Sequence, residues 1–260
     1  MDAVILAGGN PRQDELLYPL TGDTPKALLE ISGKPMLQWI LDALNQAKAI
    51  DQVIIVGLNS DCGVTSEKPI SFIPDQGSML DNIRTGIKKV ADINPSIEHT
   101  LLSTADIPGI TAEMIDWTIN TALETDEDIY YSIVTREVME SRFPGSNRSF
   151  IRLKDMEVCG GDINVIRISV ATGRDDLWNR LFASRKNAFR QAALIGFDTL
   201  FLLLLRQLTL EKLIGTVTTR LNISGRAIIN PFAEVAMDVD KPYQFDILST
   251  YFEGKRANES

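Results

Sequence analysis

The sequence predicts an α/β fold in which helices cover both faces of a mostly parallel sheet. Short apolar runs such as "AVILAGG" and "QVIIVG" end in glycine, and "HTLLSTAD" ends in aspartate. Segments with apolar residues at helical spacing alternate with these runs over about the first 135 residues. Parallel strands need long crossover connections, usually helices, so this alternation favours a parallel sheet. A chain of 260 residues is long enough for one large domain.

The expected strands are short apolar runs that stop at a turn residue. In chain order they are 3–9, 52–57, 99–106, 128–134 and 159–169, with a further strand-like run after Gly225. The expected helices are 35–48, 79–90, 112–124, a basic stretch over 174–194, and a last helix after an Asp-Val-Asp turn. Thr111 is a plausible cap of the third of these helices. Ligands of such sheets bind at the carboxyl ends of the strands, where Gly8, Gly57 and Asp106 lie.

We expect a single domain over residues 1–253, made of two halves. Strands and helices alternate regularly over about 1–135, and the pattern loosens over 136–253. The second half includes a helical insert over 174–215, and the polar tail 254–260 is expected to be disordered.

Composition excludes several classes of protein. The net charge of -9 argues against a non-specific binder of nucleic acid or anionic membranes, although a small anionic ligand needs only a local group of cations. Two cysteines, Cys62 and Cys159, make no disulfide framework and indicate a reducing cytoplasm. The one histidine, His99, makes a His-rich metal site or a Ser-His-Asp triad improbable, and we expect it on the surface or in a loop.

The most apolar segment, 194–214, has two interpretations. Its uninterrupted run from Leu200 to Leu205 is far shorter than the roughly 20 residues of a transmembrane helix, so no transmembrane segment is expected. We favour a buried core helix or a homodimer contact. The alternative is an interfacial patch that meets a lipid-like acceptor.

The glycine turn after the first strand suggests a phosphate site. Gly8 and Gly9 expose backbone N–H groups that can cradle phosphate oxygens, and Arg12 adds a cation nearby. The turn matches neither G-x-G-x-x-G nor G-x-x-x-x-G-K-[ST], which excludes those two phosphate loops. A tight turn with no ligand explains the glycine pair equally well.

The segment "TPKALLEISGKPML" favours the phosphate site over a turn with no ligand. Together with Leu6-Ala7-Gly8-Gly9 and Arg12, its Pro25-Lys26 step and its Gly33–Leu37 helix start resemble the signature of MobA-like NTP transferases, which have the Rossmann-like GT-A nucleotidyltransferase fold. The loop "NPRQDELLYPLTGDT" departs from that signature because it lacks the usual Gly-x-[ST]-[RT]-Met run. The resemblance implies that 1–135 is the nucleotide-binding half and 136–253 the acceptor-side half.

The resemblance extends along the chain and implies roles for further residues. "PDQGSMLDNIRTGI" is similar to the segment that binds the nucleotide base, and "LLSTADIPGIT" to the metal-aspartate motif. The implied nucleotide-binding residues are Leu6, Ala7, Gly8, Gly9, Gln76, Gly77, Ser78, Thr104 and Ala105. "CGGDINVIRI" is similar to the acceptor segment and implies Gly161, Asp162 and Asn164. For Asp162 and Asn164, a turn-forming role is an equal alternative.

The implied metal ligands are Asp106 and one aspartate of "AMDVDKPYQFDIL", either Asp238 or Asp240. The implied reaction is attack of an acceptor phosphate on the α-phosphorus of an NTP, with loss of pyrophosphate. Mg²⁺ takes one or two carboxylates and leaves its other positions to water and phosphates, which fits this pair. Lys26 and Arg12 would neutralise the phosphates, and a phosphate nucleophile needs no general base.

Several alternatives stay open. The acceptor is a sugar phosphate, a pterin cofactor, or an alcohol or lipid-like phosphate, and the base is cytidine, guanosine or uridine. The irregular loop after Gly9 also allows a regulatory module that binds nucleotide without turnover, although such a module does not need both metal carboxylates. The partners expected are an NTP and a small phosphorylated acceptor, with no nucleic acid.

Overall fold

The computed structural model describes residues 1–9, 11–184 and 196–259. In this part of the chain, an eight-stranded sheet has the order β10-β7-β9-β6-β1-β4-β5, and β8 pairs with β9. These strands are β1 (Asp2–Leu6), β4 (Val53–Val56), β5 (Ile70–Ile73), β6 (His99–Thr104), β7 (Ile129–Thr135), β8 (Ile151–Arg152), β9 (Glu157–Arg167) and β10 (Gly225–Ile229). A small antiparallel hairpin of β2 (Glu30–Ile31) and β3 (Lys34–Pro35) stands apart from the sheet.

The sheet is mostly parallel, which confirms the predicted fold class. β1 pairs in parallel with both β4 and β6, β4 with β5, and β10 with β7. β9 is inserted antiparallel between β6 and β7. All the parallel strands therefore end at one edge of the sheet, where an α/β fold places its ligands.

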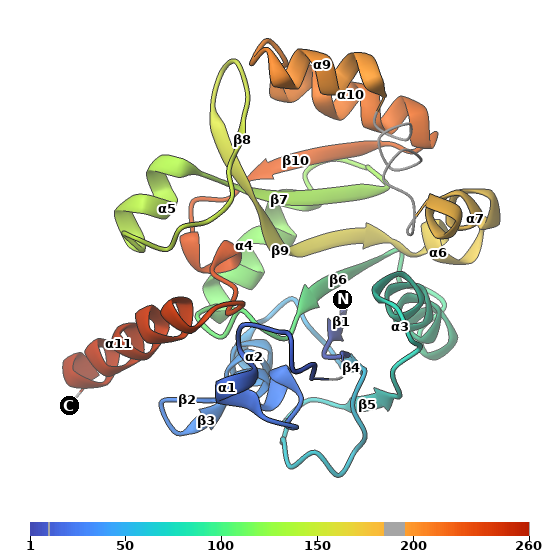
Figure 1. Ribbon diagram of the computed structural model, residues 1–260. Coiled ribbons are helices and arrows are strands. Elements are labelled where there is room, and N and C mark those ends of the chain that lie inside the picture. The colour runs from blue at the N-terminus through green and yellow to red at the C-terminus, as the bar shows by residue number, and fades with distance from the viewer. Residues whose placement is uncertain (10, 185–195, 260) are drawn as a thin grey trace.

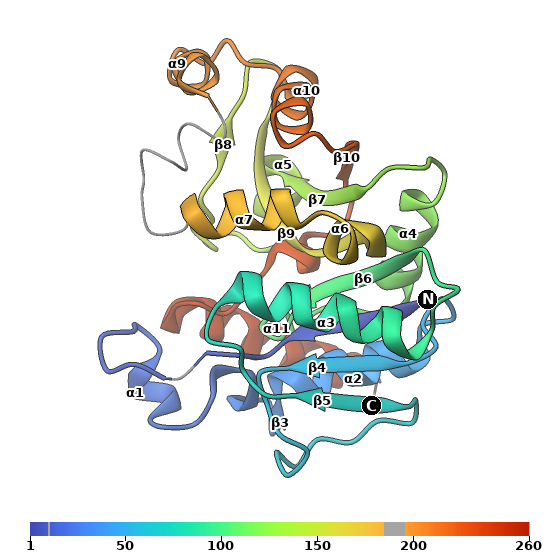
Figure 2. The ribbon, with the colours of Figure 1, turned by 90° about the vertical axis from the view of Figure 1, so that its right-hand side faces the viewer.

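Helices cover both faces of the sheet, as predicted. They are α1 (Tyr18–Thr21), α2 (Met36–Gln46), α3 (Met79–Ile93), α4 (Ala112–Ala122), α5 (Arg136–Arg142), α6 (Ile168–Thr172), α7 (Asp175–Ser184), α9 (Phe197–Leu204), α10 (Leu210–Leu221) and α11 (Pro242–Glu259), with single 3₁₀ turns η1 (Lys26–Leu28) and η2 (Ala233–Ala236). Figure 1 shows α2, α4 and α11 on one side of the sheet, and α3, α6 and α7 on the other. Figure 2 looks onto the side that carries α3, α6 and α7.

The first strand shows why its apolar run is continuous. Ala3 and Ile5 belong to the core cluster that includes α2 and α4, whereas Val4 belongs to the cluster under α3 and α6. Side chains alternate along a strand, so a strand covered on both faces needs apolar residues at every position.

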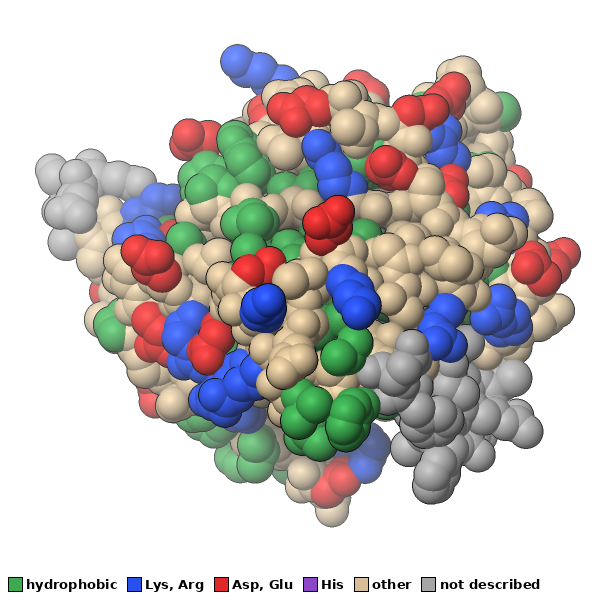
Figure 3. Space-filling model, turned by 90° about the horizontal axis from the view of Figure 1, so that it is seen from above, with side chains coloured by type: hydrophobic (Ala, Val, Ile, Leu, Met, Phe, Trp, Pro, Cys, Tyr) green, Lys and Arg blue, Asp and Glu red, His purple; other side chains and the backbone are tan. Residues whose placement is uncertain are grey.

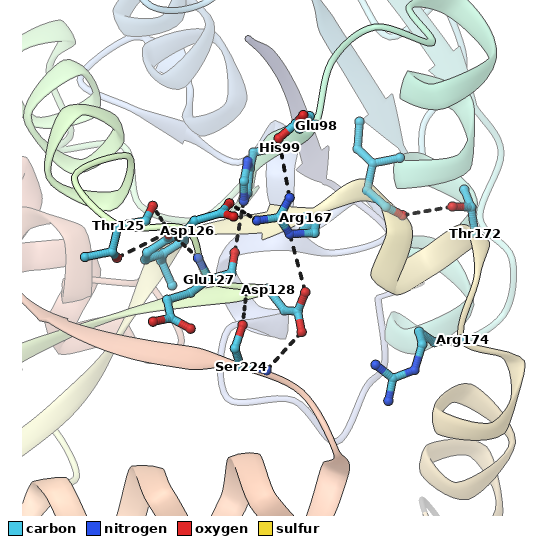
Figure 4. Close-up of polar contacts among 12 residues, drawn as sticks. Glu98, His99, Thr125, Asp126, Glu127, Asp128, Arg167, Thr172, Arg174 and Ser224 are labelled. Atoms are coloured by element: carbon cyan, nitrogen blue, oxygen red, sulfur yellow. Dashed lines mark hydrogen bonds and ion pairs between the residues drawn. The ribbon is translucent and has the colours of Figure 1, made fainter.

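The edge of the sheet opposite the strand ends is fastened by a polar network, shown in Figure 4. Arg167, at the end of β9, forms ion pairs with Glu98 and Asp128, both at 3.4 Å, and with Asp126. Nearby, His99 Nε2 donates to the carbonyl oxygen of Glu127 at 3.0 Å. His99 is only 6% exposed within β6, so the expectation of a surface or loop histidine is wrong: its ring is buried where neighbouring strands begin.

The apolar segment 194–214 does not form the buried core helix that we favoured. Its described part contains α9, in which Phe201 is 60% and Leu204 78% exposed. Figure 3 shows hydrophobic side chains gathered on the face that carries α9 and α10. The homodimer contact stays a prediction, and residues 185–194 of the predicted basic helix lie outside the described residues.

Two further findings concern helix length. None of the helices in the described ranges is long and apolar enough to cross a membrane. The last helix, α11, continues to Glu259, past residue 254 where the sequence predicts a disordered tail. Helix propagation adds one hydrogen bond for each further residue, which allows a polar stretch to extend an existing helix.

Candidate active site

Three charged side chains from distant parts of the chain meet at the carboxyl edge of the parallel strands. Lys26 Nζ lies 2.6 Å from Asp106 Oδ2 and also contacts Asp240 Oδ1. Burial by itself would lower the pKa of Lys26, but attraction to Asp106 and Asp240 outweighs burial and raises it. Lys26 therefore stays charged and holds two carboxylates at one point.

Local structure fixes the position of Asp106. It follows β6 by two residues, and the Thr104 hydroxyl donates to Asp106 Oδ1 at 2.5 Å. The backbone N–H of Val239 donates to the carbonyl oxygen of Asp106 at 2.9 Å. That bond docks the segment before α11 against the end of β6, which brings the C-terminal aspartates to the site.

The two C-terminal aspartates have different surroundings. Asp238 pairs with Arg148, and the side chains of both are 14% exposed. Asp240 is 55% exposed, contacts Lys26, and its N–H donates to Gln244 Oε1 at 2.9 Å. Asp240 is thus the aspartate that shares a cation with Asp106, while the carboxylate of Asp238 is occupied by a guanidinium.

Asp162 on β9 brings a third carboxylate to the same region. Burial raises its pKa to about 7, and the charges of Asp106 and Asp240 act in the same direction, against Arg148 and Lys26. Its Oδ2 is buried and has no hydrogen-bond partner among the described residues. A buried carboxylate with a free oxygen is costly unless a ligand satisfies it.

These residues fit a divalent cation with oxygen ligands. Asp106 and Asp240 already reach one common cation, the Lys26 ammonium, and Asp162 offers an unsatisfied oxygen beside them. In the part of the chain that the structure describes, no closed set of three or more His, Cys, Asp or Glu side chains forms a metal site. Mg²⁺ takes one or two carboxylates and completes its shell with water and phosphates.

The glycine turn lies beside this cluster of strand ends and is tightly packed. Ala7 N donates to the Val56 carbonyl oxygen at 2.8 Å, and Gly8 lies directly against Gly57 at the end of β4. A Cβ at Gly8 would collide with the side chains of Asn82 and Asp75. Gly9 has a φ of 121° with no neighbour near its Cβ position, so its backbone faces open space.

The segment expected to bind the base lies next to this turn. Asn82 Oδ1 accepts from Gln76 N at 2.7 Å, and Asn82 Nδ2 donates to Asp75 Oδ1 at 2.7 Å, so Asn82 fastens the segment to α3. Gln76 and Gly77 are exposed. Ser78 caps α3, and its hydroxyl accepts from Asp81 N at 3.2 Å.

Other predicted residues are not brought together with Lys26. Arg12 is exposed and pairs with Asp14 in its own loop, with Nε 3.0 Å from Oδ1. The side chain of Asn164 forms hydrogen bonds within the sheet. Its Oδ1 accepts from Ser132 N at 3.0 Å where the β7–β9 register shifts, and its Nδ2 donates to the Gly161 carbonyl oxygen at 3.3 Å. Gly161 packs against Ser132. Ala105 is buried, and its N–H donates to the Leu6 carbonyl oxygen at 3.0 Å.

Sequence reasoning missed two residues of this region, Arg148 and Tyr131. Arg148 lies in the turn-rich stretch before β8, yet its side chain is largely buried beside Asp238, and its buried Nε has no hydrogen-bond partner in the described structure. Tyr131 projects from β7 across Gly160 of β9. An arginine between turn residues and a tyrosine in a strand have no distinctive local pattern, so only the folded chain reveals them.

The raised pKa of Asp162 leads to a pH-dependent stability. The folded protein keeps the Asp162 proton up to about pH 7, whereas the unfolded chain loses it near the ordinary value of 3.8. The neutral Asp162 therefore contributes its full stability to the fold below pH 3.8, and this contribution is lost as the pH rises through 7. We expect Asp162→Asn to raise the Tm of the metal-free protein at pH 8 and to change it little near pH 4.

Thermal melts in EDTA at a series of pH values measure this effect. Asp155→Asn, at an exposed aspartate, is the matched control and should show no such pH-dependent gain. If the Tm difference between Asp162→Asn and the unmodified protein is the same at pH 4 and pH 8, the pKa of Asp162 is not raised in the folded protein.

Known proteins resemble this chain in sequence and in fold. A family model described as the MobA-like NTP transferase domain matches residues 3–191, more than half of the chain. A solved structure described as a hypothetical transferase from Thermus thermophilus superposes with a TM-score of 0.81 at 30% identity, covering 94% of this chain and 98% of that one. A CMP:2-keto-3-deoxy-manno-octonic acid synthetase complexed with CTP superposes with a TM-score of 0.63 at 14% identity, covering 98% and 100%, a likeness of fold alone.

Two curated relatives match over short stretches. An N-acetylmuramate alpha-1-phosphate uridylyltransferase from Neisseria meningitidis serogroup B is 46% identical over 54 residues, 21% of this chain and 22% of the relative. A UTP–glucose-1-phosphate uridylyltransferase from Haloferax volcanii is 39% identical over 61 residues, 24% of each. The matched stretches span about a quarter or less of these relatives.

Proposed function

This chain belongs to the MobA-like NTP transferase family, and from that premise we propose that it transfers a nucleotidyl group from an NTP to a phosphorylated acceptor and releases pyrophosphate. The observation that supports this most directly is the contact of one lysine, Lys26, with both Asp106 and Asp240. A cation and two carboxylates at the carboxyl edge of a parallel sheet are what phosphoryl chemistry requires there.

In the proposed reaction, an oxygen of the acceptor phosphate forms a bond to the α-phosphorus of the NTP. The bond from the α-phosphorus to the oxygen bridging to the β-phosphate breaks, and pyrophosphate leaves with the electron pair. The nucleophile is already an anion, so no side chain has to remove a proton. The chain's task is to position the two phosphates and to neutralise the charge that develops on their oxygens.

Each part of the site has a role in this proposal. The N–H groups of the Gly8–Gly9 turn bind phosphate oxygens of the NTP, and Lys26 neutralises the α-phosphate. Asp106 and Asp240 hold Mg²⁺, which supplies further charge neutralisation when bound. Gly161 and Asp162 lie on the acceptor side of the site. Arg12 adds a second cation for the phosphates only if its loop moves, because it now pairs with Asp14.

Both curated relatives are named as uridylyltransferases, so UTP is the first nucleotide to test. The acceptor is proposed only as a phosphate ester at this stage. We also propose a cytoplasmic location, since Cys62 and Cys159 are both free thiols.

A thermal-shift and pyrophosphate-release screen tests the proposal. We expect one of the four NTPs, with Mg²⁺, to raise the Tm by several degrees, and pyrophosphate to form only when a phosphorylated acceptor is added. EDTA should remove pyrophosphate release. A Tm shift with no pyrophosphate from any acceptor would favour a regulatory module that binds nucleotide without turnover. If no NTP shifts the Tm, both the nucleotidyltransferase and the regulatory module are rejected.

A further inference from the structure

An apolar cavity of about 330 Å³ lies between the sheet and α10, outside the site described above. Strands β7, β9 and β10 form its floor, and α10 forms its roof. Figures 1 and 2 show α10 next to β10 at that end of the sheet. The α10 side chains that line it are Leu210, Leu213, Ile214, Val217, Thr218 and Leu221.

The packing of α10 is unusual for an amphipathic helix. Its apolar side chains recur at helical spacing and face the sheet, yet not one residue of α10 is fully buried. The gap leaves these apolar side chains only partly buried, and a helix that turned this face to the sheet for stability alone would close the gap and bury more apolar area. The gap under α10 therefore has the character of a binding site for an apolar group.

The walls of the cavity are mostly apolar. The Thr218 hydroxyl donates to the Ile214 carbonyl oxygen at 2.9 Å within the helix. Arg226 extends a guanidinium nitrogen to the carbonyl oxygen of Thr121, and its buried Nε has no hydrogen-bond partner among the described residues. A cavity with such walls does not hold water well and takes hydrocarbon instead.

Part of the cavity wall comes from residues of β7 and β9 near the candidate active site. Tyr131, Cys159 and Gly160 are among its lining residues. The Tyr131 hydroxyl lies over Gly160, where a Cβ would overlap it. Asp162 is two residues further along β9 and lies close to Tyr131: burial, and next the charge of Asp162, raise the pKa of the Tyr131 hydroxyl. Tyr131 therefore stands between the apolar cavity and the buried carboxylate with the unsatisfied oxygen.

The size of the cavity indicates the length of its occupant. A water molecule occupies roughly 30 Å³ in the liquid, and a methylene group is of similar size. The cavity thus has room for on the order of ten chain carbons.

We infer that the acceptor is amphiphilic, a phosphate monoester of an apolar chain, with the chain under α10 and the phosphate beyond Tyr131 near Asp162 and Lys26. This inference rests on the proposed function and names its acceptor class. The phosphate oxygen forms the new bond to the α-phosphorus and pyrophosphate leaves, so the product is a nucleoside diphosphate joined to the chain and no further reactant is needed. Helix α9, which carries the exposed apolar residues Phe201 and Leu204, lies at the same end of the molecule as α10 (Figures 1 and 2).

A series of n-alkyl phosphates with four, six, eight and ten carbons tests this inference with the NTP that the screen identifies. We expect kcat/KM for pyrophosphate release to rise about fourfold for each added methylene, the gain from moving one such group out of water. Val217→Trp, which fills the cavity, should abolish this dependence on chain length. Thr219→Trp places the same side chain on the exposed side of α10 and should preserve it.

The controls separate this inference from the proposed function. An unchanged Tm shift with NTP shows that each variant is folded, and Val217→Phe serves if the tryptophan variant is not. Glucose 1-phosphate is the polar acceptor: faster turnover with it than with any alkyl phosphate, unaffected by Val217→Trp, overturns the inference and leaves the proposed function standing.

Direct binding covers the case in which no acceptor reacts. Calorimetric titration with decyl phosphate should then show binding to the unmodified protein that Val217→Trp weakens at least tenfold, which supports the inference and counts against the proposed turnover. Equal affinity for both proteins, or no binding, overturns the inference.

Discussion

Replacing Asp106 by Asn is expected to lower kcat/KM by about 10³-fold and to leave NTP affinity measured without metal nearly unchanged. The substitution removes one of the two carboxylates that meet at Lys26, and electrostatic stabilisation of this kind contributes about 10²–10³-fold for each group removed. Thr104 still holds the side chain in place through its hydroxyl, so the fold should be intact. Steady-state pyrophosphate release and NTP titration in EDTA measure the two quantities.

Variants of the two C-terminal aspartates distinguish a metal ligand from a structural ion pair. Asp240→Asn should reproduce the loss of activity, because Asp240 shares the cation with Asp106. Asp238→Asn should chiefly lower stability, since it leaves the buried guanidinium of Arg148 without its carboxylate. Asp51→Asn, at an exposed carboxylate paired with the amino terminus, is the control with no expected effect on activity. Full activity of Asp106→Asn would refute the role proposed for this residue.

Gly57→Ala is expected to destabilise the protein by about 2–5 kcal/mol and to abolish NTP binding. Gly57 has a φ of 113°, which costs an L-residue about 1–2 kcal/mol, and its Cβ would overlap the backbone of Gly8. Relieving such a clash costs a further 1–3 kcal/mol or so and moves the glycine turn that we propose for the phosphates. Urea unfolding gives the change in the free energy of unfolding.

Gly63→Ala separates backbone strain from collision. Gly63 also has a positive φ, of 81°, but no atom lies within 4 Å of its Cβ position. Its replacement should therefore cost only about 1–2 kcal/mol and leave NTP binding unchanged. Equal losses of stability in the two variants would mean that the contact between Gly8 and Gly57 is unimportant.

The sequence predicted the first half of the fold well because the relevant signals are local. The runs 53–56 and 99–104 are strands, and Thr111 caps α4 with its hydroxyl 3.4 Å from Met114 N, as predicted. The short strand β5 was missed, because four residues between a proline and a turn carry too little pattern. The prediction that this apolar segment forms a buried helix was wrong for a related reason. An apolar run predicts that a helix is covered, but it does not show which element covers it, and α9 is exposed.

For the candidate site, the sequence identified residue types and the tertiary structure determined the contacts among them. A glycine turn, a Pro-Lys step and a strand ending in aspartate are local signals, so Lys26 and Asp106 could be singled out from the sequence. The choice between Asp238 and Asp240 could not be made, because it depends on which carboxylate faces a lysine 214 residues away in the chain. The antiparallel insertion of β9, the burial of Asp162 and Arg148, and the cavity under α10 likewise arise from long-range packing. Periodicity and turn chemistry depend on residues that are neighbours in the sequence. The pairing of charges and the cavities between elements form only when distant segments pack together.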